Sequence, residues 1–392
     1  MSAGRRRRSG AALAAGAVLT VLGCASAESR PEPVPAASGG GETPAFGMTA
    51  WRSNEAPRAD FALVRRSGAP FYRFDLLTST TDDRAERPGW VRRYDRLVAA
   101  ATIEGVELLP LLMRTRPSTR EDRHARGGRG RGRSRPRKPV ADPPSTAREW
   151  AIWRARVRGI AERFGPRGRF WAEHPELPYR PFRAWEVWNE PNLRQFWDAR
   201  EPDPEEYARL VVETRRVLRA ADPHARIVSG GLGWRYSGGR YLRAVLEEAG
   251  GCAVDAVGIH PYAPTPARAM RALEEARSIA DAAGARGVPL WTTEIGWKVR
   301  DRGYAGVPSE TAQARSMQRF AGATVRRRSE LWLGPSFAFA LRDRIDPETG
   351  RTDHTAGLRR ANDSPRPAWA VWSRWAQGAR RLPLPRAREC GR

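Results

Sequence analysis

From residue 46 onward the chain alternates short apolar runs with longer stretches in which apolar residues recur at helical spacing. A short apolar run bounded by polar or turn residues predicts a buried strand. Eight such runs occur, at 46–50, 71–75, 106–112, 183–188, 226–230, 254–259, 289–294 and 335–340. Strands that alternate with helices form parallel sheets, so we expect an α/β fold, a single (β/α)8 TIM barrel. The strand count alone also fits an open doubly wound sheet.

Helical patterns fill the intervals between these runs. Between Trp150 and Phe164 the apolar residues lie three or four positions apart, and Ser145 or Thr146 can cap the start. A second helix is expected around 210–218. Two more should begin at Pro266 and Pro367, because proline is favoured in the first turn of a helix.

Residues 1–24 have the pattern of an export signal. Arg5 to Arg8 precede an apolar stretch of about a dozen residues, which is too short for a permanent membrane anchor. The stretch ends in Val21-Leu22-Gly23-Cys24, which resembles a lipoprotein signal, so Cys24 is the expected lipidation site. Cleavage after Ala27 would instead release a secreted protein. We therefore expect an exported protein whose membrane contact is at most a lipid anchor.

Three segments lack the alternation of strands and helices. Residues 25–45 are rich in Pro, Gly and Ser and predict a flexible tether before the domain at 46–380, while 381–392 form a C-terminal tail. Residues 114–138 contain 11 Arg or Lys against two acidic residues, which predicts a disordered basic loop after the third strand. The alternative is that this loop contacts an anionic polymer or envelope surface.

The formal net charge of +25 first suggests a nucleic-acid or membrane partner. However, nearly all of the 69 basic residues are arginine, because lysine occurs only at Lys138 and Lys298. Arginine in place of lysine, together with abundant Ala, Gly and Pro, is typical of a GC-rich genome. No motif of a nucleic-acid-binding protein accompanies the charge, so no nucleic-acid partner is expected.

The chain contains three cysteines. If Cys24 carries a lipid, Cys252 and Cys390 remain as a pair that could join in an oxidising compartment. Two unpaired thiols are the alternative. Because no C-x-x-C or comparable ligand spacing occurs, we expect no metal site.

Two glutamates stand at the ends of predicted strands. Glu190 lies in Asn189-Glu190-Pro191 after the fourth run, and Glu294 closes the seventh run in Thr293-Glu294-Ile295-Gly296. In a (β/α)8 barrel the carboxyl ends of all strands meet at one mouth, so the two side chains should converge. Paired carboxylates cleave glycosidic bonds, and retaining enzymes hold them about 5–5.5 Å apart.

These motifs resemble the fourth and seventh strands of clan A retaining glycoside hydrolases. The resemblance covers about 46–378 and is nearest to the family 39-like and family 5-like enzymes of actinobacteria. It implies that Glu190 is the general acid/base, that Glu294 is the nucleophile and that Asn189 binds the sugar 2-hydroxyl. This chemistry needs no metal or organic cofactor.

Two further motifs carry the same resemblance. His260-Pro261-Tyr262 closes the sixth run, and in the clan such a His lines the sugar site while the Tyr hydrogen-bonds the nucleophile. Arg73 lies in the second run, where the clan places an arginine that keeps the nucleophile ionised, since a nearby cation favours a carboxylate. Asp75 follows it without an assigned role.

Aromatic residues cluster after the strand ends, where sugar rings could stack on them. We expect Trp197, Trp234 and Trp297 to contact the sugar; the wider set also includes Trp51, Trp188, Phe196 and Tyr236. The eighth run, Phe337-Ala338-Phe339-Ala340, lacks the Trp that many family 5 enzymes carry there. Because family 39 includes enzymes acting on xylosides and on iduronides, the resemblance leaves the sugar open.

The sequence thus predicts a glycosidase that hydrolyses O-glycosyl bonds of oligo- or polysaccharide by double displacement, through a covalent glycosyl-enzyme. The first alternative is a catalytically weak carbohydrate-binding barrel at the cell surface. The second is a basic protein that binds anionic polymers through 114–138.

Overall fold

The computed structural model describes residues 42–50, 58–79, 88–115, 141–198, 200–346, 351–379 and 381–383. The predicted export signal with Cys24, together with Trp51 and Cys390, lies outside the described residues. Most of the predicted basic loop also lies outside them. Its first two residues, Arg114 and Thr115, belong to a strand, so the strand continues past the predicted loop boundary.

A parallel sheet of nine strands forms the centre of the fold. Their order is β6-β5-β4-β3-β2-β12-β9-β8-β7. In chain order they are β2 (Phe46–Thr49), β3 (Phe71–Ser79), β4 (Glu107–Thr115), β5 (Ala184–Val187), β6 (Arg226–Ser229), β7 (Leu232–Gly233), β8 (Val257–His260), β9 (Leu290–Ile295) and β12 (Leu333–Phe339). Each of the eight apolar runs overlaps one of these strands, so the predicted strands are confirmed, although several extend beyond the predicted limits.

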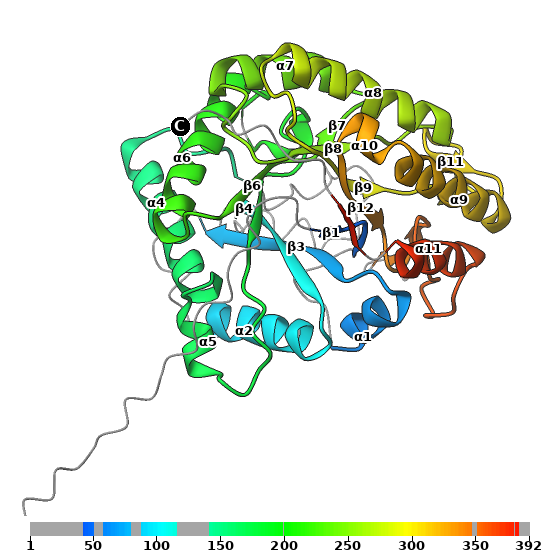
Figure 1. The fold of residues 1–392 in the computed structure, drawn as a ribbon, viewed down its shortest axis with the longest axis horizontal. Helices are drawn as coiled ribbons and strands as arrows, with labels where there is room; N and C mark the ends of the chain where they lie inside the picture. The colour runs from blue at the N-terminus through cyan, green and yellow to red at the C-terminus, as the bar shows by residue number, and fades with distance from the viewer. Residues whose placement is uncertain are drawn as a thin grey trace, which may run out of the picture. The chain divides into compact units, whose positions relative to one another are not determined.

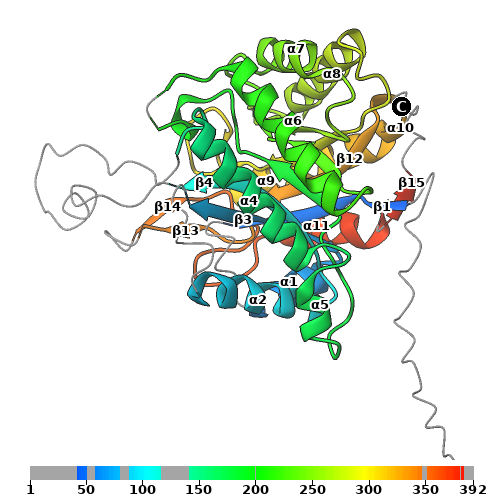
Figure 2. The same ribbon diagram turned by 90° about the vertical axis from the view of Figure 1, so that its left-hand side faces the viewer.

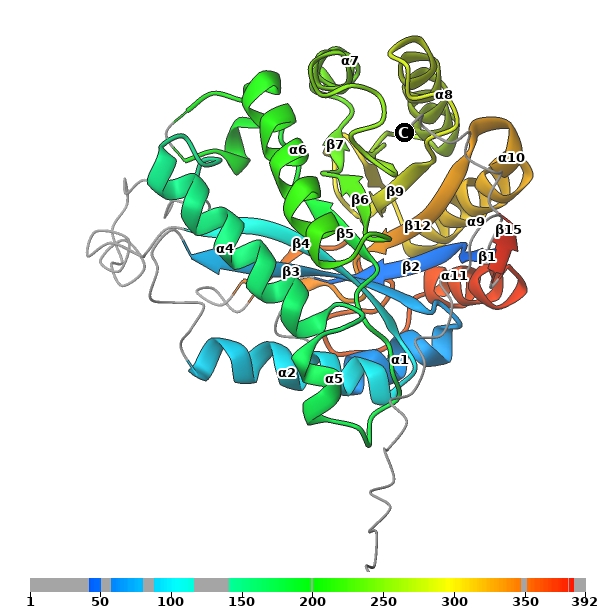
Figure 3. The ribbon, with the colours of Figure 1, turned by 60° about the vertical axis from the view of Figure 1, so that its left-hand side comes forward.

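The two edge strands of this sheet, β6 and β7, are separated along the chain only by Gly230 and Gly231. β6 pairs with β5, β7 pairs with β8, and a parallel bridge joins Val228 to Ala256 at the start of β8. The sheet therefore curls until its two edges meet (Figure 3), which is consistent with the predicted barrel and not with an open sheet.

Helices surround the sheet (Figure 1). They are α1 (Arg58–Ser67), α2 (Pro88–Ile103), α4 (Ala147–Phe164), α5 (Arg169–Glu173), η2 (Arg194–Phe196), α6 (Pro204–Ala221), α7 (Gly238–Ala249), α8 (Pro266–Ala282), α9 (Glu310–Arg326), α10 (Arg328–Leu331) and α11 (Pro367–Gly378). The predicted helix starts at Pro266 and Pro367 are confirmed. Of the two predicted caps of α4, the structure selects Thr146, which forms a capping box with Glu149.

The interior of the curled sheet is filled near the beginning of the strands. A small buried cluster there consists of Phe71, Leu109, Ala184, Val228, Ala256, Trp291 and Phe337. Most of these residues lie in the first half of their strands. Apolar packing therefore closes the amino end of the sheet and leaves the carboxyl ends of the strands for polar side chains.

Short strand pairs extend the fold at both ends. β1 (Glu42–Pro44) pairs antiparallel with β15 (Arg381–Pro383), so the ordered region exceeds the predicted limits of 46 and 380. Backbone pairing needs no apolar side chains, and the composition of these segments could not predict it. At the other end of the sheet (Figure 2), β13 (Arg344–Ile345) pairs with β14 (Thr352–His354). A further pair is β10 (Lys298–Val299) with β11 (Gly306–Val307).

The state of Cys252 and the character of the helices are two further features of the described residues. Cys252 is disulfide-bonded, so it is not one of two unpaired thiols. The described part of the chain has no helix that combines the length and the apolar character needed to cross a membrane.

Candidate active site

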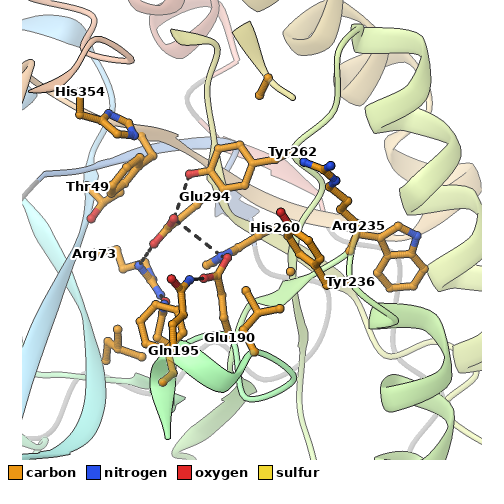
Figure 4. A pocket seen from close by; sticks show the side chains of 18 of the residues that line it. Thr49, Arg73, Glu190, Gln195, Arg235, Tyr236, His260, Tyr262, Glu294 and His354 are labelled. Carbon is orange, nitrogen blue, oxygen red and sulfur yellow. Dashed lines mark hydrogen bonds and ion pairs between the residues drawn. The ribbon is translucent and has the colours of Figure 1, made fainter. Parts of the chain in front are cut away.

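A cavity of about 620 Å³ opens at the carboxyl ends of the strands (Figure 4). Six predicted site residues with polar side chains line it together: Arg73, Asn189, Glu190, His260, Tyr262 and Glu294. They come from β3, from the turn after β5, from β8 and its following loop, and from β9. The converging strand ends thus bring together residues that are up to 221 positions apart.

A strained turn positions Glu190 after β5. Trp188 and Glu190 both have positive φ, at 72° and 41°, a region that residues other than glycine seldom adopt. The backbone N–H of Glu190 donates to the carbonyl of Gly231 at 3.1 Å, which ties the turn to the link between β6 and β7. This turn directs the Glu190 side chain into the cavity mouth.

Arg73 links the acidic residues of the site. It is 2% exposed; its Nη1 donates to Glu294 Oε1 at 2.7 Å, its Nη2 donates to Asn189 Oδ1 at 2.7 Å, and its Nε donates to Glu186 Oε2 at 2.5 Å. Burial alone would lower the pKa of Arg73, but Glu186 and Glu294 outweigh burial and raise it. Arg73 is therefore a permanent cation that fixes the positions of Glu294 and Asn189.

Glu186 is a member of this network that the sequence analysis did not assign. It is fully buried and accepts from two nitrogens of Arg73 and from the backbone N–H of Gly231. The sequence did contain an indication of this role: Glu186 is the only charged residue in the buried run Ala184–Trp188. A charge in such a run requires a buried partner.

Glu294 is also held from the opposite side. The hydroxyl of Tyr262 donates to Glu294 Oε2 at 2.9 Å. Burial, with a contribution from the charge of Glu294, raises the pKa of Tyr262 well above its usual value, so the phenol keeps its proton. The two oxygens of Glu294 are thus fixed by two different donors.

His260 lies between the two catalytic candidates. Its Nδ1 is 3.1 Å from Glu190 Oε1 and 3.7 Å from Glu294 Oε2, while its Nε2 is 3.0 Å from Thr293 Oγ1. Burial lowers the pKa of His260, but the two carboxylates raise it by more, and the net shift is upward. His260 Nδ1 thus lies within contact distance of both carboxylates.

Two neighbours of this group were missed at the sequence level. Gln195 donates to Glu190 Oε2 at 3.2 Å. Gly231 packs so closely that a Cβ there would lie 2.0 Å from His260 Nε2 and 2.5 Å from Thr293 Oγ1. The Gly230-Gly231 pair between two strand segments was the available signal for such a close approach.

The expected tryptophan contacts require a correction. Trp234 lines the cavity, and its Nε1 donates to Glu275 Oε2 at 2.9 Å. Trp197 and Trp297 do not line it: they are 3% and 0% exposed, and their Nε1 atoms donate to the carbonyls of Pro191 and Ala263. Both are therefore core side chains. The prediction was wrong because a position after a strand end does not reveal which way the ring points.

Other aromatic residues line the cavity instead. Phe339 ends β12, and its ring meets that of His354 edge-on at 5.7 Å. It stands in the eighth run, where the Trp of many family 5 enzymes was missing. Tyr236 and Tyr304 line the cavity as well, and Tyr236 is 54% exposed.

No group of three or more His, Cys, Asp or Glu side chains that could hold a metal ion occurs among the residues the structure describes. The polar groups of the cavity are instead arranged around the two glutamates.

Comparison with known proteins supports a carbohydrate-active fold. Residues 183–328 match the family model described as glycosyl hydrolase catalytic core. None of the curated proteins matches the chain significantly. The matched region holds Glu190, His260, Tyr262 and Glu294.

Among solved structures, a family 39 glycoside hydrolase from the gut symbiont Bacteroides cellulosilyticus WH2 is similar, with a TM-score of 0.59 and 20% identity over 86% of this chain and 64% of that one. A monomeric β-xylosidase from Caulobacter crescentus CB15 is similar with a TM-score of 0.60 and 18% identity, over 88% of this chain and 70% of that one. A GH5_18 protein from Bifidobacterium longum subsp. infantis is similar with a TM-score of 0.60 and 13% identity, over 87% of this chain and 80% of that one.

The chain thus spans less than two thirds of the length of the Bacteroides protein. At these identities the structural likeness establishes the fold. With the catalytic-core match, it confirms the resemblance to clan A glycoside hydrolases of the family 39-like and family 5-like type.

Proposed function

We propose that this chain is a retaining O-glycoside hydrolase that acts on oligo- or polysaccharide by double displacement on a (β/α)8 barrel. The observation that carries the proposal is the single His260 Nδ1 atom that lies within 3.7 Å of an oxygen of each glutamate. These two oxygens, Glu190 Oε1 and Glu294 Oε2, are therefore no more than about 6.8 Å apart. That limit accommodates the retaining spacing of about 5–5.5 Å, which supports the proposal.

The different partners of the two glutamates support different roles. Glu294 accepts from Arg73 and Tyr262, which aim a fixed carboxylate into the cavity, as a nucleophile requires. Glu190 has no hydrogen bond to Arg73 among the described residues; its side-chain contacts are His260 and Gln195, so it is not tied to the buried cation that holds Glu294. Glu190 is thus the more suitable acid and base.

In the first step, Glu294 attacks the anomeric carbon while Glu190 gives its proton to the leaving oxygen. The bond from the anomeric carbon to that oxygen breaks, and a glycosyl ester with Glu294 forms. In the second step, Glu190 removes a proton from water, the water oxygen attacks the anomeric carbon, and Glu294 is released as a carboxylate. Asn189, fixed by Arg73, is placed to bind the 2-hydroxyl, and Phe339 and Trp234 offer rings to the sugar.

The proposal is tested with a panel of activated aryl glycosides and three proteins: wild type, Glu294→Gln and Glu190→Ala. We expect both variants to lose activity, and azide to rescue Glu190→Ala by forming a glycosyl azide of retained configuration. Wild-type activity that survives in Glu294→Gln would contradict the assignment. Glycan binding without turnover in all three proteins would support the carbohydrate-binding alternative instead.

We also propose that the protein is exported and carries a lipid on Cys24. The sequence of residues 1–24 and the disulfide at Cys252, a bond typical of oxidising compartments, support this location. Labelling cells with a palmitate analogue should mark the wild type and not Cys24→Ser. An unlabelled wild-type protein in the culture medium would favour cleavage after Ala27.

The basic segment 114–138, apart from the two residues that belong to β4, is proposed to contact anionic polymer or an anionic envelope surface. Its charge supports this role, and binding should weaken with salt. Unchanged binding to anionic glycans at low salt after deletion of 118–138 would remove the proposal.

A further inference from the structure

Two cations in the cavity are not matched by acidic groups. Arg235 and Lys298 both line the cavity, and neither pairs with a carboxylate within the part of the chain that the structure describes. Arg73 differs from these two cations, because its guanidinium forms ion pairs with both Glu186 and Glu294. A cation without an acidic partner beside a substrate cavity is available to an anionic ligand.

Arg235 is held in place by aromatic rings. Its guanidinium carbon lies 4.1 Å from the ring centre of Tyr304 and 5.1 Å from that of Tyr236. Such cation–π contacts orient a guanidinium while leaving its N–H groups free to donate in the ring plane. Asp301 also lines the cavity, in the loop that carries Tyr304, but its carboxylate accepts the backbone N–H of Gly303 and forms no ion pair with another described residue.

The position of Arg235 assigns it to one half of the cavity. It follows β7, which lies beside β8, whereas Thr49 and Phe339 end β2 and β12 on the far side of β9. Figure 4 shows Arg235 and Tyr236 on one side of the two glutamates and Thr49 and His354 on the other.

Glu190 lies between the two sides of the cavity and borders the side that contains Arg235. A Cβ on Gly233, two residues before Arg235, would lie 3.5 Å from Glu190 Oε1. The acid donates its proton to the leaving oxygen, so the leaving group must extend along this wall.

We propose that the half of the cavity that contains Arg235, together with Lys298 at the start of the loop that carries Tyr304, binds a leaving group that carries an anion, namely the carboxylate of a uronic-acid residue in an acidic oligo- or polysaccharide. The inference rests on the proposed glycosidase function and further specifies that the leaving group of the substrate is negatively charged. A carboxylate matches the planar fork of a guanidinium with two parallel hydrogen bonds, and Lys298 adds a second positive charge.

The test uses pairs of aryl glycosides that differ only in the leaving group: 3-carboxy-4-nitrophenyl glycosides and their methyl esters. Each pair is made on several sugars, and kcat/KM is measured for wild type, Arg235→Gln, Lys298→Gln and Arg302→Gln. Arg302 is exposed and lies in the same loop as Lys298 without lining the cavity, so its variant removes an equal charge nearby. Sulfonate and phosphate analogues then show whether the site distinguishes a carboxylate from other anions.

We expect the wild type to prefer the carboxylate over its ester about tenfold in kcat/KM. The preference should fall toward one in Arg235→Gln, fall less in Lys298→Gln, and persist in Arg302→Gln. Turnover of both substrates with no preference, or a preference unchanged in Arg235→Gln, would overturn this inference while leaving the glycosidase function intact. If neither member of any pair is turned over, the proposed function fails and this inference fails with it.

Discussion

Arg73 and Arg366 are two of the buried arginines that bind carboxylates, and of these two only Arg73 lines the candidate active-site cavity. Arg73 joins Glu186, Asn189 and Glu294 across three strands. Arg366 is 6% exposed and binds both oxygens of Asp343, at 2.5 and 2.6 Å. The two ion clusters are alike in chemistry and burial.

The difference lies in where the remaining donors point. Arg366 uses its other N–H groups on Glu310 and on the carbonyl of Gly357, so the cluster fastens the loop after β12 to α9 and α11. Arg73 directs one N–H to Glu294, whose second oxygen faces Tyr262 inside the cavity. A buried arginine thus supports catalysis or only the fold, according to whether it reaches a carboxylate that lines the cavity.

Arg73→Lys should give the largest effect. An ammonium group cannot span Glu186, Asn189 and Glu294 together, so Glu294 loses its orientation. We expect kcat to fall about 10²–10³-fold, as when a catalytic hydrogen-bond donor is removed. Steady-state kinetics on the best aryl glycoside measures this. A variant that keeps near-wild-type kcat would show that Arg73 is no more catalytic than Arg366.

Arg366→Met is the matched substitution in the second cluster. Removing one partner leaves Asp343 buried without its cation, which should lower the free energy of unfolding by about 3–5 kcal/mol in urea titration. Because Arg366, Asp343 and Glu310 do not line the cavity that holds Glu190 and Glu294, kcat per folded molecule should remain close to that of the wild type. A kcat loss as large as that of Arg73→Lys would erase the distinction between the clusters.

Glu186→Gln separates the two functions of Arg73. The substitution keeps the shape but removes the charge that balances the guanidinium, so we expect about tenfold lower kcat with a smaller change in KM. The comparison of kcat with KM distinguishes poor positioning of Glu294 from poor binding. If only stability falls, Glu186 serves the fold alone.

Glu149→Gln should give the smallest effect. It measures how much the partly exposed ion pair between Arg114 and Glu149 contributes to stability. Burial raises the pKa of Glu149, but Arg114 and the N–H groups of Ser145 and Thr146 outweigh burial and lower it to about 2. Because the folded-state pKa is lowered, its stabilisation is present above pH 4.5 and is lost as the pH falls toward 2. We expect the variant to lose about 1 kcal/mol at pH 7.

The difference between Glu149→Gln and wild type should therefore shrink in acid, as measured by urea unfolding from pH 7 to pH 2. A difference that stays constant over this range would mean that the carboxylate charge does not contribute.

The sequence was most informative where periodicity and strand ends decide the outcome. The eight apolar runs predicted the strands, and Glu190, His260 and Glu294 at their ends predicted the residues that meet in the cavity. Sequence position could not show side-chain direction, which is why Trp197 and Trp297 were expected at the sugar and lie in the core. It also could not show that Glu186, inside a strand, belongs to the network of Arg73.

The most direct test of the double displacement is to trap its intermediate. Wild type is incubated with activated 2-deoxy-2-fluoro glycosides, which slow the second step, and is then analysed by intact-mass and peptide mass spectrometry. We predict a mass increase of one fluoroglycosyl residue, located on Glu294 and absent in Glu294→Gln. Turnover of ordinary substrate without any adduct, or an adduct on another residue, would contradict the assignment.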